Sequence, residues 1–186
     1  MKQKGVSFLE IIVVVAILLI ASVFVSPNIM DWRSKRNLEA DYLSLLSTID
    51  FLKTRVRTIN GTGLLICNPN SVLTYQISSN PQSSASLVSS SFTANLLEDP
   101  SATNAAFNIL SGGSTVTSTL CSSGRGIFTA SGLSGMEGSA SPIVIELNRN
   151  GTRDPIGAYQ VIVNQTTGFV QKYKWKQASN GWIELD

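Results

Sequence analysis

The stretch KGVSFLEIIVVVAILLI, residues 4–20, decides how this sequence is interpreted. It opens an apolar run over residues 11–25 that is interrupted by a single serine, and the helix-competent segment extends over residues 6–30. A segment of about 25 largely apolar residues is long enough to cross a bilayer. Lys2 and Lys4 precede it, so the positive-inside bias places its start in the cytoplasm and everything after it outside. The sequence therefore predicts a membrane-spanning helix with an extracytoplasmic body.

The end of this run differs from the end of a cleaved secretory signal peptide. It closes in Val-Phe-Val-Ser-Pro, residues 23–27, which lacks the small-residue A-x-A pattern of a cleavage site.

The start of the run carries Glu10, although an acidic side chain costs about 2.5–3.5 kcal/mol at the centre of a span and less near its end. Two interpretations of Glu10 are open on these residues alone: a carboxylate at headgroup depth favoured by the helix dipole, or one paired with another protein group.

The segment GVSFLE, residues 5–10, resembles the class III leader of type IV pilins and type II secretion pseudopilins. The resemblance implies that a prepilin peptidase cuts between Gly5 and Val6 and that the new N-terminus is methylated. It also implies that Glu10 pairs with the N-terminal amine of a neighbouring subunit as the helix enters a filament. Val6 stands where the family usually has phenylalanine. Pro27 matches the position at which pilin helices commonly bend, because proline removes one helical hydrogen bond.

An apolar stripe follows the predicted span. Seven residues recur at alternating intervals of four and three and therefore share one helix face: Leu38, Tyr42, Leu45, Ile49, Leu52, Val56 and Ile59. The pattern ends at Asn60-Gly61, which is a good helix stop. Because it lasts only about three heptads before β-rich sequence begins, we expect a helix that packs its stripe on a sheet rather than a coiled coil.

Strand patterns begin after residue 61. They are predicted at residues 64–67, 72–77, 143–147, 159–163 and 169–176, the last two forming a hairpin. The middle of the chain, residues 78–141, is rich in Ser, Thr, Asn, Gly and Ala, and we expect loops and short strands of unpredicted order there. The late strand and turn, followed by a hairpin containing Gly168, resemble the FimT/FimU-type minor pilins and the H-type pseudopilins.

The two cysteines, Cys67 and Cys121, are expected to form a disulfide because the body of the protein lies outside the cytoplasm. The bond would close a loop of about 54 residues, worth roughly 4 kcal/mol in the chain-entropy model. A pair of buried free thiols is the alternative. Major pilins usually close a disulfide near the C-terminus, and the absence of any cysteine after Cys121 argues against a major pilin.

The residues needed for most kinds of catalysis are missing. The chain has no histidine, no C-x-x-C pair and no phosphate-binding G-x-x-x-x-G-K-[ST] loop, so we expect neither an enzyme nor a cofactor or metal site. Glu98 and Asp99 are interpreted as surface acids of a loop. Residues 148–154 superficially resemble a calcium loop, but one carboxylate beside two arginines favours a simple turn.

Lysines and aromatic residues alternate near the end of the chain, in the order Lys172, Tyr173, Lys174, Trp175 and Lys176. In an extended strand the three ammonium groups share one face and the two aromatic rings the other. One interpretation is a stripe that contacts nucleic-acid phosphates with help from Arg149 or Arg153, because some FimT-like pilins are DNA receptors. The other is an edge strand whose lysines prevent aggregation while the aromatic rings pack inward. We favour the edge strand, since removal of the leader would leave 12 basic and 12 acidic side chains.

The sequence thus predicts an α+β protein of the type IV pilin kind, in which a long N-terminal helix packs on an antiparallel sheet. The expected parts are a leader over residues 1–5, a transmembrane and filament-core helix over 6–30, an amphipathic helix over 31–60, and a β-rich head over 61–186. The implied location is the bacterial inner membrane, with the head in the periplasm, before assembly and the pilus filament or its tip afterwards.

The function implied by the resemblance is that of a minor type IV pilin, a structural subunit that initiates or caps pilus assembly through its N-terminal helix. The alternatives are a type II secretion pseudopilin and a DNA-binding minor pilin of natural transformation. The implied partners are other minor and major pilins, the prepilin peptidase and the inner-membrane assembly platform; nucleic acid is not favoured.

Overall fold

The computed structural model describes residues 7–68, 72–78, 96–98, 109–110, 112–123, 125–139 and 141–186. Within these ranges it leaves out the side chains of residues 21–28, 68, 72, 96–98 and 123. The described elements, in chain order, are α1 (Phe8–Ile59), β1 (Thr62–Asn68), β2 (Val72–Ser78), β3 (Leu96–Glu98), β4 (Thr115–Ser118), α3 (Leu120–Ser123), β5 (Arg125–Thr129), β6 (Ser134–Met136), β7 (Ile143–Asn148), β8 (Tyr159–Val163), β9 (Val170–Lys176), the 3-10 helix η1 (Gln177–Ser179) and β10 (Gly181–Leu185).

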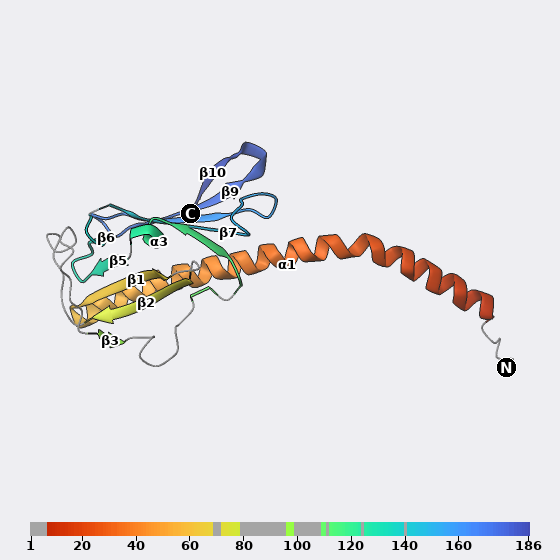
Figure 1. Cartoon of the computed structure of the whole chain (residues 1–186), viewed down its shortest axis with the longest axis horizontal. Coiled ribbons are helices and arrows are strands. Elements are labelled where there is room, and N and C mark those ends of the chain that lie inside the picture. The colour runs from red at the N-terminus through yellow and green to blue at the C-terminus, as the bar shows by residue number, and fades with distance from the viewer. Residues whose placement is uncertain are drawn as a thin grey trace.

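Helix α1 is one continuous helix of 52 residues that curves in its N-terminal half (Figure 1). It ends at Asn60, whose backbone is left-handed with φ 50° and ψ 43°. Asparagine tolerates this conformation well, and the N–H of Gly61 closes the helix end by donating to the carbonyl of Val56 at 2.9 Å. The predicted helix stop at Asn60-Gly61 is confirmed.

The predicted stripe of α1 is the centre of the core. Six of its seven residues are at most 5% exposed, namely Leu38, Tyr42, Leu45, Ile49, Leu52 and Val56, and Ile59 packs partly buried against them. The period of the sequence therefore identified the buried face of the helix.

The described strands form two antiparallel sheets of five strands each, in the orders β3-β2-β1-β5-β6 and β10-β9-β8-β7-β4, which we call the first and the second sheet. The stripe of α1 shares one core with side chains of both sheets, such as Leu65 and Phe128 of the first and Ile145 and Val161 of the second. Strand β1 lies very close to the helix, since a Cβ added at Gly63 would sit 2.9 Å from a methyl of Val56. Figure 1 shows β1 and β2 beside the C-terminal half of α1.

The predicted α+β architecture, with a long N-terminal helix and antiparallel sheets, is confirmed. Strands β1, β2, β7, β8 and β9 overlap the predicted strands, and β4, β5 and β6 are short strands inside the segment 78–141. The rest of that segment, apart from β3, α3 and a few connecting residues, lies outside the described residues, as does Asp99.

Strand β10 was not predicted, and it changes the place of β9. It pairs with β9 from Gly181↔Lys176 to Leu185↔Lys172, so β9 is an interior strand and the predicted hairpin of β8 and β9 is followed by a further one. The interpretation of β9 as an edge strand was wrong. The chain reverses through the short η1 and Asn180, which is left-handed with φ 45°. Asn180 and Gly181 form an Asn-Gly pair, a common turn signal that the sequence interpretation did not use.

The structure contains a disulfide between Cys67 of β1 and Cys121 of α3, with 4.8 Å between their Cα atoms. Helix α3 lies between β4 of the second sheet and β5 of the first in the chain. The bond therefore ties the central strand of the first sheet to the segment that connects the two sheets, and the alternative of two free thiols is wrong.

Among the helices that the structure describes, none is both long and apolar enough to cross a membrane. The predicted span over residues 6–30 includes residue 6 and the side chains of residues 21–28, which are outside this description. The span therefore stays a prediction.

Candidate functional site

The first part of α1, which we call the N-terminal arm and define as residues 8–20, carries a continuous exposed apolar surface. Its large apolar side chains are 48–78% exposed: Phe8, Leu9, Ile11, Ile12, Val13, Val14, Val15, Ile17, Leu18, Leu19 and Ile20. A contiguous apolar surface of this kind marks a site that contacts other proteins or lipid. The arm is therefore the first candidate functional surface.

Glu10 is the acidic residue in the first turn of α1. Its carboxylate makes no hydrogen bond or ion pair with the residues that the structure describes. Gly5 and Val6, the predicted processing residues, lie outside the described residues. The backbone of Pro27 is part of the continuous helix, and its side chain is not described.

Asp41 attaches the helix to the head and was missed by the sequence interpretation. Its carboxylate is 1% exposed and accepts hydrogen bonds from the backbone N–H groups of Gly112, at 2.6 Å, and Ser114, at 3.0 Å. Asp41 lies three residues after Leu38 and four before Leu45, so it falls on the apolar face, where a carboxylate needs a partner. That position was the signal that could have identified it.

Tyr42 joins α1 to the second sheet. Its ring stacks on the ring of Tyr159 in β8, with 4.3 Å between the ring centroids and 17° between the planes. Burial raises the pKa of the Tyr42 phenol, and the neighbouring Tyr159 raises it further. The phenol therefore stays neutral at pH values where a tyrosine in water has begun to ionise.

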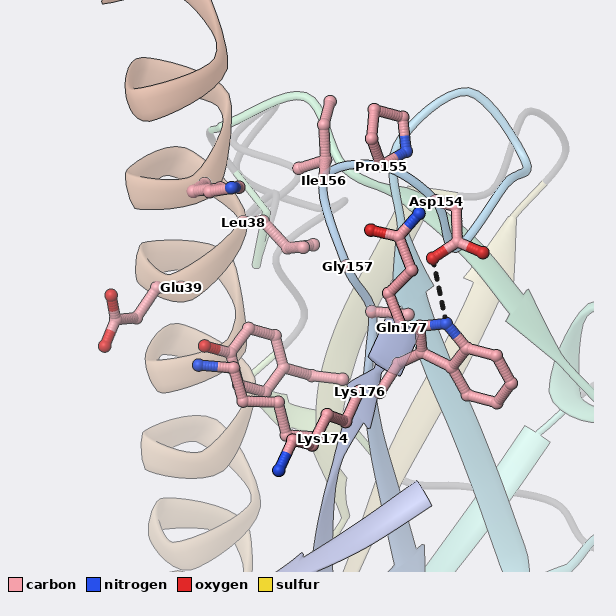
Figure 2. Close-up of a pocket in the computed structure, with 13 residues that line it drawn as sticks. Leu38, Glu39, Asp154, Pro155, Ile156, Gly157, Lys174, Lys176 and Gln177 are labelled. Carbon is pink, nitrogen blue, oxygen red and sulfur yellow. Dashed lines mark hydrogen bonds between the residues drawn. The ribbon is translucent and has the colours of Figure 1, made fainter. Parts of the chain in front are cut away.

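The three predicted lysines lie on the face of the second sheet that looks toward α1. Lys172 and Lys174 are opposite Val161 and Tyr159 in β8, both of which belong to the core, and Lys176 follows by strand alternation. Figure 2 shows Lys174 and Lys176 on this side of β9. The prediction that the three ammonium groups share one face agrees with this register.

The lysines of the stripe have different surroundings. Lys172 is half-buried and donates to the backbone carbonyl of Asp186. Lys174 is exposed, and its ammonium lies 5.4 Å from the centre of the Tyr159 ring. Its methylene stem covers part of the core while its charge stays in water, which explains how a lysine occupies this face.

The aromatic partners of the lysines lie on the outer face of the second sheet, so the prediction that they pack inward was wrong. Trp175 is opposite Trp182 of β10, and the two rings meet edge to face with 5.5 Å between centroids. Tyr173 is opposite Gln160 and Glu184 on the same face. The pairing of β9 with β8 explains this orientation. Tyr159 and Val161 of β8 face the core, and the residues of β9 directly opposite them on the same face are lysines.

Arg153 is held on this outer face. It donates to both carboxylate oxygens of Glu146, from Nε at 2.9 Å and from Nη2 at 2.8 Å. Its guanidinium lies 4.8 Å from the ring centre of Trp175 and 5.0 Å from that of Trp182. The pKa of Arg153 is raised by the hydrogen bond with Glu146, against a smaller lowering by burial and with a further rise from the charge of Glu146.

Arg149 donates to the backbone carbonyl of Gly113, beside β4. Because Arg149 and Arg153 are held at these places, the structure does not bring either of them to the lysine stripe. A joint site of these arginines with the stripe is therefore not formed, and contact with phosphates stays a prediction.

A pocket of about 330 Å³ lies where α1 approaches the end of β9 (Figure 2). We call it the neck pocket; its lining residues are Lys35, Leu38 and Glu39 of α1, the segment Asp154–Tyr159, and the segment Lys174–Gln177. A second pocket, of about 520 Å³, lies further along α1, and we call it the tail pocket. It is lined by Asp50 and Lys53 of α1, the segment Phe169–Lys172, and the segment Glu184–Asp186.

Within the part of the chain that the structure describes, no group of three or more His, Cys, Asp or Glu side chains could hold a metal ion. Comparison with models of protein families, with curated proteins and with solved structures finds no match to this chain.

Proposed function

We propose that this protein is a minor type IV pilin, a structural subunit that initiates or caps pilus assembly. Its N-terminal helix is held in the inner membrane before assembly and is then packed among the helices of other pilins. The head remains exposed and makes the contacts that decide the position of the subunit. In this proposal the protein has a pilin-like fold, in which α1 is the long helix that the sheets pack against.

The observation that carries this proposal is the division of α1 into two halves with different surroundings. The arm, residues 8–20, is exposed and apolar, whereas the stripe from Leu38 to Val56 is buried in the head. The two halves belong to one helix of 52 residues, about 78 Å long at the usual rise. A head fixed to a long apolar arm is suited to a subunit whose arm is covered first by lipid and then by other subunits.

Glu10 has a defined role in this proposal. A carboxylate on an apolar surface is costly unless it is paired, and Glu10 has no partner among the described residues. After cleavage between Gly5 and Val6, the N-terminal amine of a neighbouring subunit would supply a positive charge at the same depth. The pairing would favour one longitudinal register of neighbouring helices.

Quantification of sheared pili tests the proposal. We expect deletion of the gene to remove most surface pili, and expression of the wild-type chain to restore them. Glu10→Ala should fail to restore them, whereas Asp31→Ala, which removes an exposed acid further along the same helix, should restore them. Normal piliation after deletion would refute the pilus role, and a type II secretion pseudopilin would then be the favoured function.

The mass of the intact protein tests the processing step separately. We expect a chain that lacks residues 1–5 and carries one additional methyl group. A chain that retains Met1 to Gly5 would show that the segment GVSFLE is not a prepilin peptidase site in this protein, and it would leave an uncleaved membrane anchor as the alternative.

We do not propose the DNA-binding alternative. Lys172 already donates to the carbonyl of Asp186, and Arg149 and Arg153 are engaged away from the stripe. These engagements leave too short a row of free cations for a track of backbone phosphates.

A further inference from the structure

The neck pocket holds a positive charge that the surrounding residues leave uncompensated. Three lysines line it: Lys35 from α1 and Lys174 and Lys176 from β9. None of them forms an ion pair with another residue that the structure describes. The acids of the lining are directed elsewhere, since Glu39 points away from the pocket and the Asp154 carboxylate accepts the indole N–H of Trp175 at 3.1 Å (Figure 2).

The inner wall of the neck pocket is apolar. Leu38 and Tyr159 are buried there, and Ile156 is half-buried on the loop that forms the opposite rim. The loop is fixed in place, because the N–H of Gly157 donates to the carbonyl of Arg153 at 2.7 Å. A volume of about 330 Å³ is within the usual range for a ligand pocket. The ligand that fits this chemistry combines negative charge with an apolar group.

The spacing of the lysines indicates the shape of the ligand. Lys174 and Lys176 lie two residues apart on one face of β9, which places their Cα atoms roughly 6.7 Å apart. Residues i and i+2 of any extended peptide have the same spacing. An extended peptide with acidic residues at i and i+2 can therefore place one carboxylate beside each of the two ammonium groups.

We propose that the neck pocket binds an extended acidic segment of a partner protein. Its carboxylates at i and i+2 pair with Lys174 and Lys176, and an apolar side chain at i−2 lies on Leu38 and Ile156. Lys35 faces the same segment from the opposite wall. This site goes beyond the proposed function and does not depend on it, because the pocket belongs to the head and the neck of α1 rather than to the arm.

The pocket favours a peptide over duplex nucleic acid. Its lysines line a concave space with an apolar wall, whereas a duplex is bound by cations spread along a surface that follows the phosphates. Two arginines of the head cannot extend the site in that way, since Arg153 is held by Glu146 on the outer face and Arg149 by the backbone of Gly113.

Binding to the full chain in a mild detergent tests the proposal. The probe is a fluorescently labelled peptide, Leu-Ala-Glu-Ala-Glu-Ala, blocked at its C-terminus, and its matched control has glutamine in place of both glutamates. Fluorescence anisotropy should show saturable binding of the glutamate peptide, about tenfold tighter than binding of the glutamine peptide. The difference should shrink when salt is raised, because the ion pairs are exposed.

Two double variants localise the site. Lys174→Gln with Lys176→Gln should weaken binding of the glutamate peptide by about tenfold. Lys53→Gln with Lys172→Gln, which line the tail pocket, makes the same change in net charge and should leave binding unaltered. Circular dichroism of each variant checks that the fold is retained.

Four results would overturn the proposal. They are the absence of saturable peptide binding, equal affinity for the glutamate and glutamine peptides, equal loss in the two double variants, and displacement of the peptide by duplex DNA at concentrations below those of unlabelled peptide. The last result would assign the site to nucleic acid. None of these results bears on piliation, so this proposal and the proposed function fail independently.

Discussion

The buried carboxylate of Asp41 offers a sharp test of how the helix is fixed to the head. Asp41→Ala removes the acceptor of two backbone hydrogen bonds, from Gly112 and Ser114. Hydrogen bonds to a charged group contribute about 1.5–3 kcal/mol each, and the two freed N–H groups are only half-buried and regain part of this from water. We therefore expect the free energy of unfolding to fall by about 2–4 kcal/mol.

Urea unfolding of the full chain in detergent, followed by circular dichroism, measures this loss as a lower midpoint with an unchanged slope. Asp41→Asn should lose less, because its amide oxygen can still accept one of the two bonds. Asp50→Ala is the matched control, since Asp50 is an exposed acid nine residues further along α1. A change for Asp41→Ala within about 0.5 kcal/mol of the Asp50→Ala value would refute the assigned role.

Three further predictions concern the core. Leu45→Ala, at a side chain with no exposed surface, should lower the free energy of unfolding by about 2–5 kcal/mol through the cavity it leaves, as a lower urea midpoint would show. The pKa of Tyr42 is raised by burial and further by Tyr159, so in the folded state its phenol keeps the proton above the unfolded pKa of about 10. The free energy of unfolding is therefore undiminished below that pH and falls as pH rises through the folded pKa. Alkaline unfolding curves would detect this decline. Replacement of Cys67 and Cys121 by serine should cost roughly 4 kcal/mol, measured as the difference in urea midpoint from the oxidised protein.

Each of these predictions has a matched comparison. Leu43→Ala, at a side chain that is 57% exposed, should leave the urea midpoint nearly unchanged, and an equal loss at both leucines would contradict the assignment of the buried face. Tyr42→Phe should make the alkaline decline less steep; an identical decline would show that Tyr42 does not contribute to it. Chemical reduction of the wild-type disulfide should reproduce the serine variant, and full stability after reduction would rule out a stabilising role for the bond.

The sequence predicted the elements whose patterns report burial directly. The intervals of four and three along α1 identified its buried face because only one side of that helix half meets the core. Helix termination at Asn60 was equally predictable, since the residue type and the required left-handed backbone agree. Strands such as β7 and β8 were recognised from continuous or alternating β-branched residues.

The orientation of β9 was not predictable from its own residues. A period of two defines two faces, and aromatic residues are normally the better guess for the inner one. Here the face that continues from the core carries Lys174, and Trp175 instead packs on Trp182 and Arg153 outside. The decisive information was the register with β8 and the presence of β10, both of which depend on residues outside the strand.

The candidate functional surfaces were predicted only where they depend on neighbouring residues in the sequence. Glu10 and the arm are local features, recognisable from a charge in front of an apolar run. The neck pocket combines Lys35 with residues more than a hundred positions later, and only the packing of α1 against the second sheet brings them together. The role of Asp41 also depends on distant backbone groups, although its place on the apolar face was a local signal.

The central position of the stripe of α1 has a consequence for the order of events during synthesis. The stripe leaves the ribosome before any of the strands that cover it, and its core partners extend from Leu65 of β1 to Val163 of β8. A nascent chain that stops before β7 has no second sheet, so the Tyr42 ring lacks Tyr159 and one side of the stripe stays in contact with water. Helix α1 is thus synthesised first but is among the last elements to be fully buried. The risk of aggregation during synthesis is greatest in the interval between the emergence of Val56 and that of Val163.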